Sequence, residues 1–266
     1  MGQPGGWVLG NDRPQSLTYN SYLRVDDLIA LQEPLSSPVA HDELLFIIIH
    51  QVYELWFKQI LFELDDVTVH LQKGNLIPAL RRLERVREIF RILIQQVDIL
   101  ETMTPVEFNR FRAKLNPASG FQSLQFRELE LVCGADPQGY DKFKELNPEW
   151  MKRLEHRLSK PSLRQAFFTL LRNEGLIQTD DLVPAALLEI YQDTAPDSTL
   201  RSLCEGLITL DEQIGIWRFR HVQMVERMIG MKPGTGGSLG VGYLKSTLGK
   251  KFFPELWAAR TQMATY

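Results

Sequence analysis

The stretch that most constrains the fold is residues 41–71, where apolar side chains recur every three or four positions over about eight helical turns. One stripe along it contains Phe46, His50, Tyr53, Phe57, Leu61 and Leu64, and a neighbouring stripe contains Leu45, Ile49, Val52, Trp56 and Ile60. A helix that is apolar over so wide an arc is buried among other elements. The pattern therefore predicts a long helix in the middle of a helical fold.

Helical periodicity continues along the chain, and the alternation typical of strands is nearly absent. No linker and no internal repeat divides the sequence. We predict one all-α domain over residues 1–266, built from long antiparallel helices, with residues 1–18 as a flexible N-terminal tail. Further helices are expected at residues 19–32, 78–101, 106–115, 122–132, 147–158, 163–174, 185–192 and 199–230.

Composition excludes several classes of partner. Lys and Arg (30) are fewer than Asp and Glu (33), which is not the footprint of a nucleic-acid-binding protein. The longest aliphatic–aromatic run, residues 44–49, is far shorter than a membrane span, and the N-terminus lacks the regions of a signal peptide. The two cysteines, Cys133 and Cys204, form no CxxC motif, which is typical of a reduced protein. We therefore expect a cytoplasmic protein that binds neither nucleic acid nor a membrane.

Two histidines lie on apolar helical stripes. His221 follows Leu210, Ile214 and Trp217 at spacings of three and four, and His50 lies between Phe46 and Tyr53. Each is either a core histidine satisfied by hydrogen bonds or a ligand to a metal or to haem iron. The two are 171 positions apart with no third histidine at ligand spacing, which argues against a three-histidine zinc site. A porphyrin needs only one histidine, because it supplies four ligands itself.

Two further segments are candidates for ligand binding. The loop at residues 232–242, "KPGTGGSLGVG", matches neither a P-loop nor a dinucleotide fingerprint. It is either a surface loop or a lid whose backbone N–H groups and Thr235 hydroxyl hold an anionic group. Arg112 lies one helical turn after Phe108, so it is either a surface arginine or a partner for the carboxylate of a substrate with an apolar body.

Taken together, the segments closely resemble the tryptophan 2,3-dioxygenase family. The matching motifs extend from residue 19 to the C-terminal "FPELWAART", in the family's order: "YNSYL", "HDELLFIIIHQVYELWFKQILFELD", "TMTPVEFNRFR", "NPASGFQSLQFR", "RFRHVQMVERMIG" and "KPGTGGSLGVGYL". The resemblance implies a homotetramer that holds haem b, ferrous in the active form. It implies an enzyme that inserts both atoms of O₂ across the indole C2–C3 bond of L-tryptophan to give N-formylkynurenine.

Site residues follow from the same resemblance. His221 matches the proximal axial ligand of the haem iron, His50 the distal histidine that hydrogen-bonds the indole N–H, and Phe46 the wall beside the indole. Arg112 matches the partner of the substrate carboxylate, and Thr235 the loop residue at the amino-acid end of the substrate. Ser119 matches a serine near the haem propionate and the substrate ammonium, while Tyr19, Tyr22 and Leu23 match a segment that reaches into a neighbouring subunit's pocket.

Two positions depart from the pattern. Phe108 stands where some bacterial members have a tyrosine that also contacts the carboxylate, and Leu239 stands in "GGSLG" where the family usually has "GGSSG". One alternative is therefore a biosynthetic member that oxygenates a substituted tryptophan, such as a β-methyl derivative, and inserts a single oxygen atom. Another is a helical ligand-binding protein without redox function, against which the intact His50, Arg112 and His221 argue.

Overall fold

The computed structural model describes residues 16–137, 140, 147–193, 198–234 and 240–263. Within these ranges every regular element is a helix, which confirms the all-α class. The predictions of a single domain and of a cytoplasmic location stay predictions.

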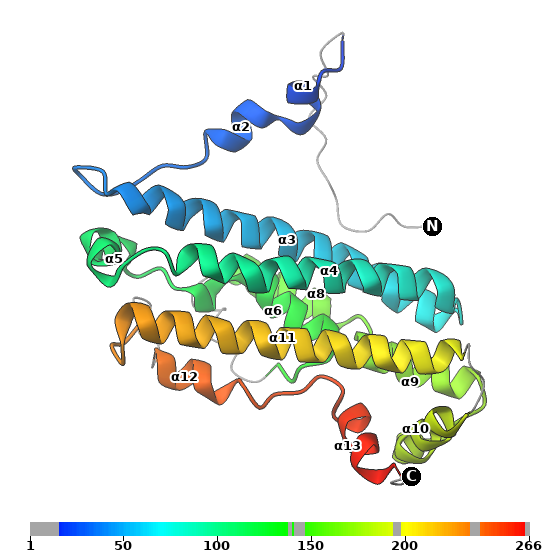
Figure 1. The fold of residues 1–266 in the computed structure, drawn as a ribbon. Helices are drawn as coiled ribbons and strands as arrows, with labels where there is room; N and C mark the ends of the chain where they lie inside the picture. The colour runs from blue at the N-terminus through cyan, green and yellow to red at the C-terminus, as the bar shows by residue number, and fades with distance from the viewer. Residues whose placement is uncertain (1–15, 138–139, 141–146, 194–197, 235–239, 264–266) are drawn as a thin grey trace.

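Three long helices form the framework of the molecule: α3 (His41–Gln72), α4 (Leu76–Leu100) and α11 (Thr199–Ile229). They lie side by side, and α4 packs against both of the others (Figure 1). As predicted, α3 runs antiparallel to α4, and it also runs antiparallel to α11. Because α4 packs against both helices, the side chains of α3 and α11 that meet behind it can line a common space.

Shorter helices cover the ends and one side of this framework. Helices α6 (Leu124–Cys133) and α9 (Leu163–Asn173) pack on α3, and α12 (Val241–Ser246) packs on α11. The pattern did not indicate α12 or α13, which are too short for periodicity to reveal. The remaining elements are α5 (Pro105–Phe111), η1 (Arg112–Leu115), η2 (Gly120–Gln122), α8 (Pro148–Leu158), η3 (Asp180–Leu182), α10 (Val183–Gln192) and α13 (Pro254–Gln262).

The N-terminal segment differs from the single helix expected at residues 19–32. It forms two short helices, α1 (Tyr19–Leu23) and α2 (Val25–Ile29), that project away from the three long helices (Figure 1). The break lies at Arg24, whose φ of 52° is left-handed and whose N–H caps α1 by donating to the Asn20 carbonyl. A left-handed residue cannot continue an α-helix, and here no packing against the bundle opposes the break.

The core consists of two neighbouring apolar clusters. The larger one fills the space between the three long helices, α6, α9 and α10, and its fully buried members include Leu64, Leu83, Phe90, Leu129, Phe167 and Leu207. The smaller one lies at the α5 end and includes Ile49, Val97, Leu100, Met103, Phe111, Met224 and Met228. His50 and His221 each follow or precede members of these clusters along their helices, so the packing fixes both positions.

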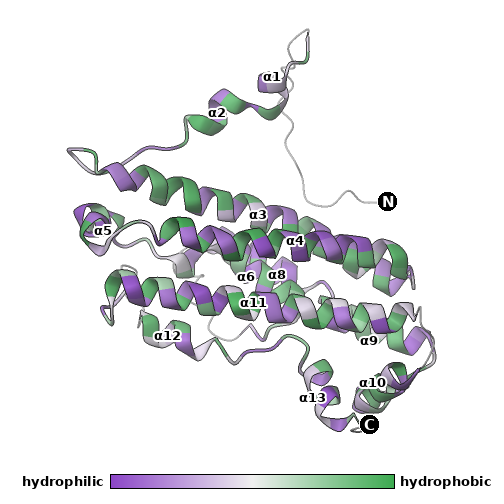
Figure 2. Ribbon diagram, in the orientation of Figure 1, coloured by the Kyte–Doolittle hydropathy of each residue, from purple (hydrophilic) through white to green (hydrophobic). Residues whose placement is uncertain are grey.

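Helix α3 is apolar on its outer side as well as toward the core. By length and composition it is the one described helix that could cross a membrane, although a core helix of a soluble protein passes the same test. Ile48, Leu55 and Phe62 recur at seven-residue spacing and are exposed, and Figure 2 shows hydrophobic residues recurring along this helix. Only 22% of its most apolar window is buried. A single chain thus leaves one apolar face of α3 uncovered.

Glu43 fixes the start of α3 to the preceding segment. Its buried carboxylate accepts hydrogen bonds from the backbone N–H of Leu35 (2.7 Å), from that of Ser36 (3.0 Å) and from the Ser36 hydroxyl. Burial alone would raise the pKa of this carboxyl, but the three hydrogen bonds outweigh it and lower the pKa. The ionised form is therefore the one that stabilises the fold.

We predict that Glu43→Gln lowers the free energy of unfolding at pH 7 by roughly 1–3 kcal/mol. The folded pKa lies below the unfolded value of about 4.3, so the contribution is complete above about pH 5 and is lost as the pH falls through the folded pKa. Urea unfolding between pH 3 and pH 7 measures this, with the exposed Glu33→Gln as control. If the difference in the free energy of unfolding between Glu43→Gln and the unmodified protein stays constant or widens at low pH, the assignment is contradicted.

Candidate active site

His50 and Phe46 lie one turn apart near the start of α3. Their ring centroids are 4.1 Å apart, and His50 Nδ1 lies 2.7 Å from the Phe46 carbonyl oxygen. A carbonyl can only accept, so Nδ1 carries the proton and, in the neutral ring, Nε2 is the acceptor. The helix backbone itself therefore selects the tautomer of His50.

The surroundings of His50 keep its ring neutral. Desolvation lowers the pKa of His50, and it outweighs the Phe46 carbonyl and the charge of Glu54, both of which raise the pKa. The side chain is nevertheless exposed. Neighbouring protein atoms therefore desolvate the ring of His50, although solvent still reaches the side chain.

His221 lies on α11 and is half-buried. Its ring stacks on Trp217, with the planes 12° apart and the centroids 5.5 Å apart. Desolvation, followed by the charges of His50 and Arg127, lowers the pKa of His221 to about 4. His50 thus lies within electrostatic reach of His221, and the two neutral rings, one from α3 and one from α11, share one region of the molecule. Each keeps a nitrogen lone pair.

Aromatic rings fill the region beside the two histidines. The Trp217 ring lies 4.9 Å from Phe126 and 6.0 Å from both Tyr53 and Phe57. Phe108, one of the predicted site residues, lies 5.7 Å from Phe46 and packs with the smaller cluster. These rings give the region flat apolar walls.

Arg112 ends α5 and begins η1, close to the start of the glycine-rich loop. Its Nη2 donates to the Pro233 carbonyl oxygen at 2.7 Å. A hollow of about 520 Å³ lies here, with Asn109, Arg112 and Asn116 on one side and residues 232–234 on the other. Gly240 closes the loop against its own start, since a Cβ there would lie 2.7 Å from the Lys232 carbonyl oxygen. Arg112 is thus brought against the start of the loop that the sequence analysis interpreted as either a surface loop or a lid.

Ser119 lies at the N-terminus of η2, where its hydroxyl oxygen accepts a hydrogen bond from the Phe121 N–H (3.3 Å). The next segment is tied to α3, because Glu54 accepts hydrogen bonds from the Ser123 hydroxyl (2.5 Å) and the Gln125 side chain (2.8 Å). This connection holds the Ser119 segment beside the helix that carries His50.

Other predicted residues are not gathered at this site within one chain. Tyr19, Tyr22 and Leu23 lie on α1, apart from the three long helices, with the two tyrosines 75% and 71% exposed. Thr235 and Leu239 lie outside the described residues.

The sequence of the whole chain decides the family. The family model for tryptophan 2,3-dioxygenase matches residues 10–179 and 141–263. The chain belongs to the tryptophan 2,3-dioxygenase family.

Its curated relatives in the tryptophan 2,3-dioxygenase family match over nearly their full length. The protein of that name from a Nocardioides species is 50% identical over 263 residues, covering 97% of this chain and 98% of the relative. Those from Herpetosiphon aurantiacus and Caulobacter vibrioides are 46% and 43% identical, each covering 94% of this chain and 99% of the relative.

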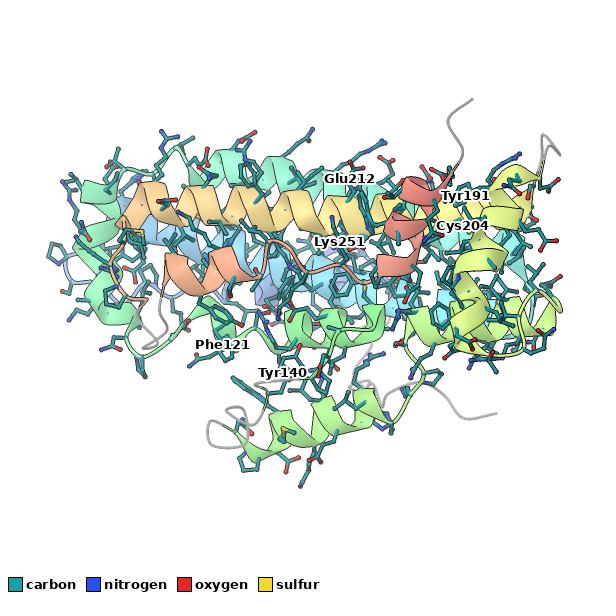
Figure 3. The ribbon with its side chains drawn as sticks, turned by 90° about the horizontal axis from the view of Figure 1, so that it is seen from below. Phe121, Tyr140, Tyr191, Cys204, Glu212 and Lys251 are labelled. Carbon is teal, nitrogen blue, oxygen red and sulfur yellow. The ribbon has the colours of Figure 1, made fainter. Side chains whose placement is uncertain are left out.

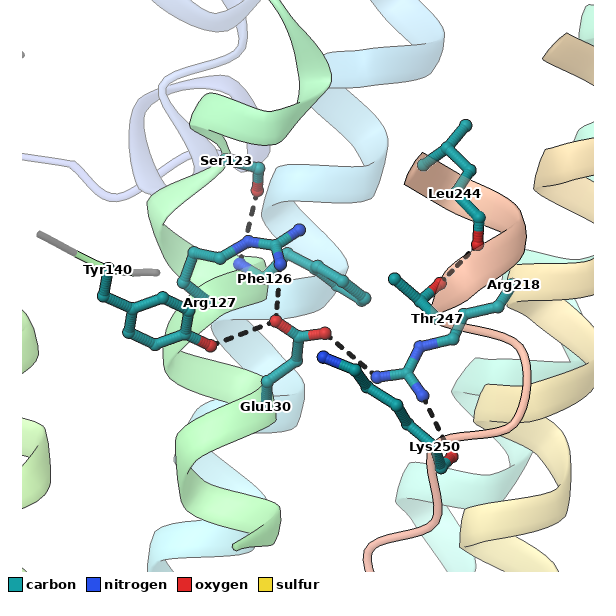
Figure 4. A network of polar contacts seen from close by, with 9 residues as sticks. All are labelled: Ser123, Phe126, Arg127, Glu130, Tyr140, Arg218, Leu244, Thr247 and Lys250. Atoms are coloured by element: carbon teal, nitrogen blue, oxygen red, sulfur yellow. Dashed lines mark hydrogen bonds and ion pairs between the residues drawn. The ribbon is translucent and has the colours of Figure 1, made fainter. Parts of the chain in front are cut away.

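In this member of the tryptophan 2,3-dioxygenase family, a buried ionic network lies next to the aromatic walls (Figure 4). The sequence analysis did not predict it. Glu130 on α6 lies between two arginines, with Arg127 Nη1 donating to its Oε2 (2.6 Å) and Arg218 Nη2 to its Oε1 (2.9 Å). The available signal was three charged residues on otherwise apolar helix faces, which periodicity treats as exceptions rather than as partners.

Proposed function

We propose that this protein is a haem-dependent dioxygenase that cleaves the indole C2–C3 bond of L-tryptophan with O₂ and forms N-formylkynurenine. The observation that carries the proposal is the pair of neutral histidines from α3 and α11 in one aromatic-walled region, with Arg112 at its loop side. The names of the relatives support tryptophan as the substrate.

The residues present fit a haem cofactor. Haem iron needs one neutral nitrogen ligand, which the low pKa of His221 provides, and the macrocycle needs flat apolar walls such as Trp217 and Phe126. Among the described residues no cluster of three His, Cys, Asp or Glu side chains could hold a bare metal ion. In the proposal His221 would hold the haem iron, and the bound haem would supply the ferrous iron that activates O₂.

His50 and Phe46 would hold the indole. The Phe46 carbonyl fixes the proton of His50 on Nδ1, so Nε2 can accept a hydrogen bond from the indole N–H. Because desolvation lowers the pKa of His50 and favours the neutral ring, the acceptor is present at neutral pH. The Phe46 ring offers an apolar face to the indole, and the exclusion of water strengthens the polar contacts at either end of the substrate.

Arg112 would bind the substrate carboxylate. The Pro233 carbonyl takes one of its N–H donors, and arginine carries five, so a carboxylate can bind to the same guanidinium. This geometry ties the carboxylate end of the substrate to the base of the glycine-rich loop. In the proposal Thr235 and Ser119 contribute to the same end, with Ser119 also close to a haem propionate.

The direct test is the mass of the product. Ferrous, haem-loaded protein is incubated with L-tryptophan under ¹⁸O₂, and the product is analysed by mass spectrometry. We expect the gain of two labelled oxygen atoms. A gain of one atom would favour the monooxygenase alternative, for which nothing in the relatives' names speaks, and no product with tryptophan would overturn the proposed substrate. No reaction with any indole amino acid would favour the ligand-binding alternative.

We predict that Arg112→Met raises the KM for L-tryptophan by about ten- to a hundredfold, because a charge-assisted hydrogen bond contributes roughly 1.5–3 kcal/mol. The KM for tryptamine, which lacks the carboxylate, should change little. Steady-state kinetics with both substrates measures the difference. Lys114→Met, an exposed cation on the same η1 helix, is the matched control. Equal losses for both substrates would remove Arg112 from carboxylate binding.

We also propose a homotetramer whose N-terminal segment completes a neighbouring site. Two observations support it: the exposed apolar face of α3, with Ile48, Leu55 and Phe62, and the exposed Tyr19 and Tyr22 on the projecting α1. Apolar surface of this extent is stabilised by burial against another chain. An active site completed by Tyr19, Tyr22 and Leu23 of a neighbour would then require the assembly.

Replacement of Phe62, which is 57% exposed, by glutamate should break the assembly, because it places a charge in the apolar face. Light scattering should give four times the 30.7 kDa chain mass for the unmodified protein and a smaller species for the variant. Leu158→Glu, an exposed apolar position on α8, serves as control. A tetramer that persists in Phe62→Glu would exclude this face from the interface, and an unmodified protein that is monomeric would refute the tetramer.

A further inference from the structure

Arg127 belongs to a buried hydrogen-bonded network in which two arginines share one carboxylate. Glu130 is the carboxylate between the Arg127 and Arg218 guanidiniums, and the Tyr140 hydroxyl donates to the same Oε2 as Arg127, at 3.1 Å (Figure 4). The nearby buried Asp211 contacts neither arginine, because it accepts from the backbone N–H groups of Phe252 and Phe253 and from the Trp257 indole. A buried guanidinium N–H without an acceptor is unfavourable unless a ligand supplies one.

The two arginines are not equivalent in this network. Arg218 has a second partner, since its Nη1 donates to the Lys250 carbonyl oxygen at 3.3 Å. Arg127 has unmet capacity, because its Nε is buried and has no hydrogen-bond partner among the described residues. Only about a tenth of the Arg127 side chain is exposed, so water does not compensate at that nitrogen. Arg127 is therefore the member of the pair that lacks an acceptor.

A chain of aromatic contacts connects Arg127 to the region of the two histidines. Its guanidinium lies over the Phe126 ring, 4.9 Å from the centroid, and Phe126 contacts Trp217, on which His221 stacks. On its other side it lies 5.3 Å from the centroid of the Phe121 ring, and the Phe121 N–H is the donor to the Ser119 hydroxyl. Phe121 lies toward α12, at the opposite end of the molecule from Tyr191 and Cys204 (Figure 3). The charge of Arg127 also reaches His221.

We propose that Arg127 binds a carboxylate of the haem, with Glu130 holding its guanidinium in place and Arg218 fixing Glu130 from the other side. This assignment rests on the proposed haem-dependent function. A propionate would supply an anionic acceptor for the guanidinium, whose Nε has no partner among the described residues.

The same contacts are also compatible with a purely structural role, in which Arg127 only joins α6 to the Phe121 segment. The two roles differ in one measurable respect. A structural arginine supports every haem derivative equally, whereas a propionate partner supports only a haem whose carboxylates are charged.

The test is a titration of the full-length apoprotein with haemin and with haemin dimethyl ester, in which methylation removes the negative charges. The Soret band reports the Kd of each. The unmodified protein should bind haemin more tightly than the ester by about tenfold or more. Arg127→Met should weaken haemin binding by about tenfold and change ester binding by less than about twofold. Arg127→Lys, which keeps the charge but loses the planar fork of donors, should lie between them.

Tyr140→Phe is the matched control, because it removes another donor to the same Glu130 oxygen without changing charge. It should leave the ratio of the two Kd values, that for the ester and that for haemin, unchanged. Equal weakening of both ligands by Arg127→Met, or an unmodified protein that does not discriminate between them, overturns the proposal. If Arg127→Met fails to fold by circular dichroism, an unchanged ratio in Arg127→Lys also overturns it. Absence of any Soret band in the unmodified protein would instead refute the proposed function.

Discussion

The structure depends on the packing of α4 between α3 and α11. Both outer helices are fixed against α4 by a continuous apolar core, which includes Leu64, Phe90 and Leu207. This leaves the side chains of α3 and α11 to meet through aromatic rings, with Tyr53 and Phe57 contacting Trp217. His50 and His221 lie at the end of that aromatic contact. Desolvation by the surrounding protein, rather than the charge of a partner, is the largest influence on the pKa of each histidine, and it favours the neutral ring.

The ionic groups around this core have a consistent arrangement. Glu54 ties α3 to the segment before α6, Asp211 ties the C-terminal residues to α11, and Glu130 joins α6 to α11 through its arginines. Each carboxylate thus connects a long helix to a neighbouring segment. Breaking the buried pairs of Glu130 is costly, because the remaining charge keeps its desolvation penalty.

Much of the fold could be predicted from local pattern. The starts of α3 and α11 were predicted at the observed residues and their ends within one residue, because long amphipathic periods dominate there. The break at Arg24 could not be predicted, because it depends on the missing contact between α1 and the bundle rather than on a glycine or proline. The same limit applies to α12 and α13, which are too short to show a period.

The candidate site divides in a similar way. His50, His221 and Arg112 were found from their spacing together with the family resemblance, and their roles remain proposals. That Arg112 bonds to Pro233 could not be inferred, since the residues are 121 positions apart. Likewise, the link from Arg127 through Glu130 to Arg218 joins α6 to α11, and Glu130 and Arg218 are 88 positions apart in the sequence. Pairing over such distances is a property of tertiary structure and leaves no local pattern in the sequence.

The central claim is our proposal that His221 would bind the haem iron and that His50 would not. The most direct measurement is the absorption spectrum of haemin-loaded His221→Gly and His50→Ala, each with and without added imidazole. The account predicts that His221→Gly loses the spectrum of a histidine-ligated haem and regains it with imidazole, whereas His50→Ala retains it throughout. A His221→Gly protein with an unchanged spectrum, or loss of ligation in His50→Ala alone, would contradict the account.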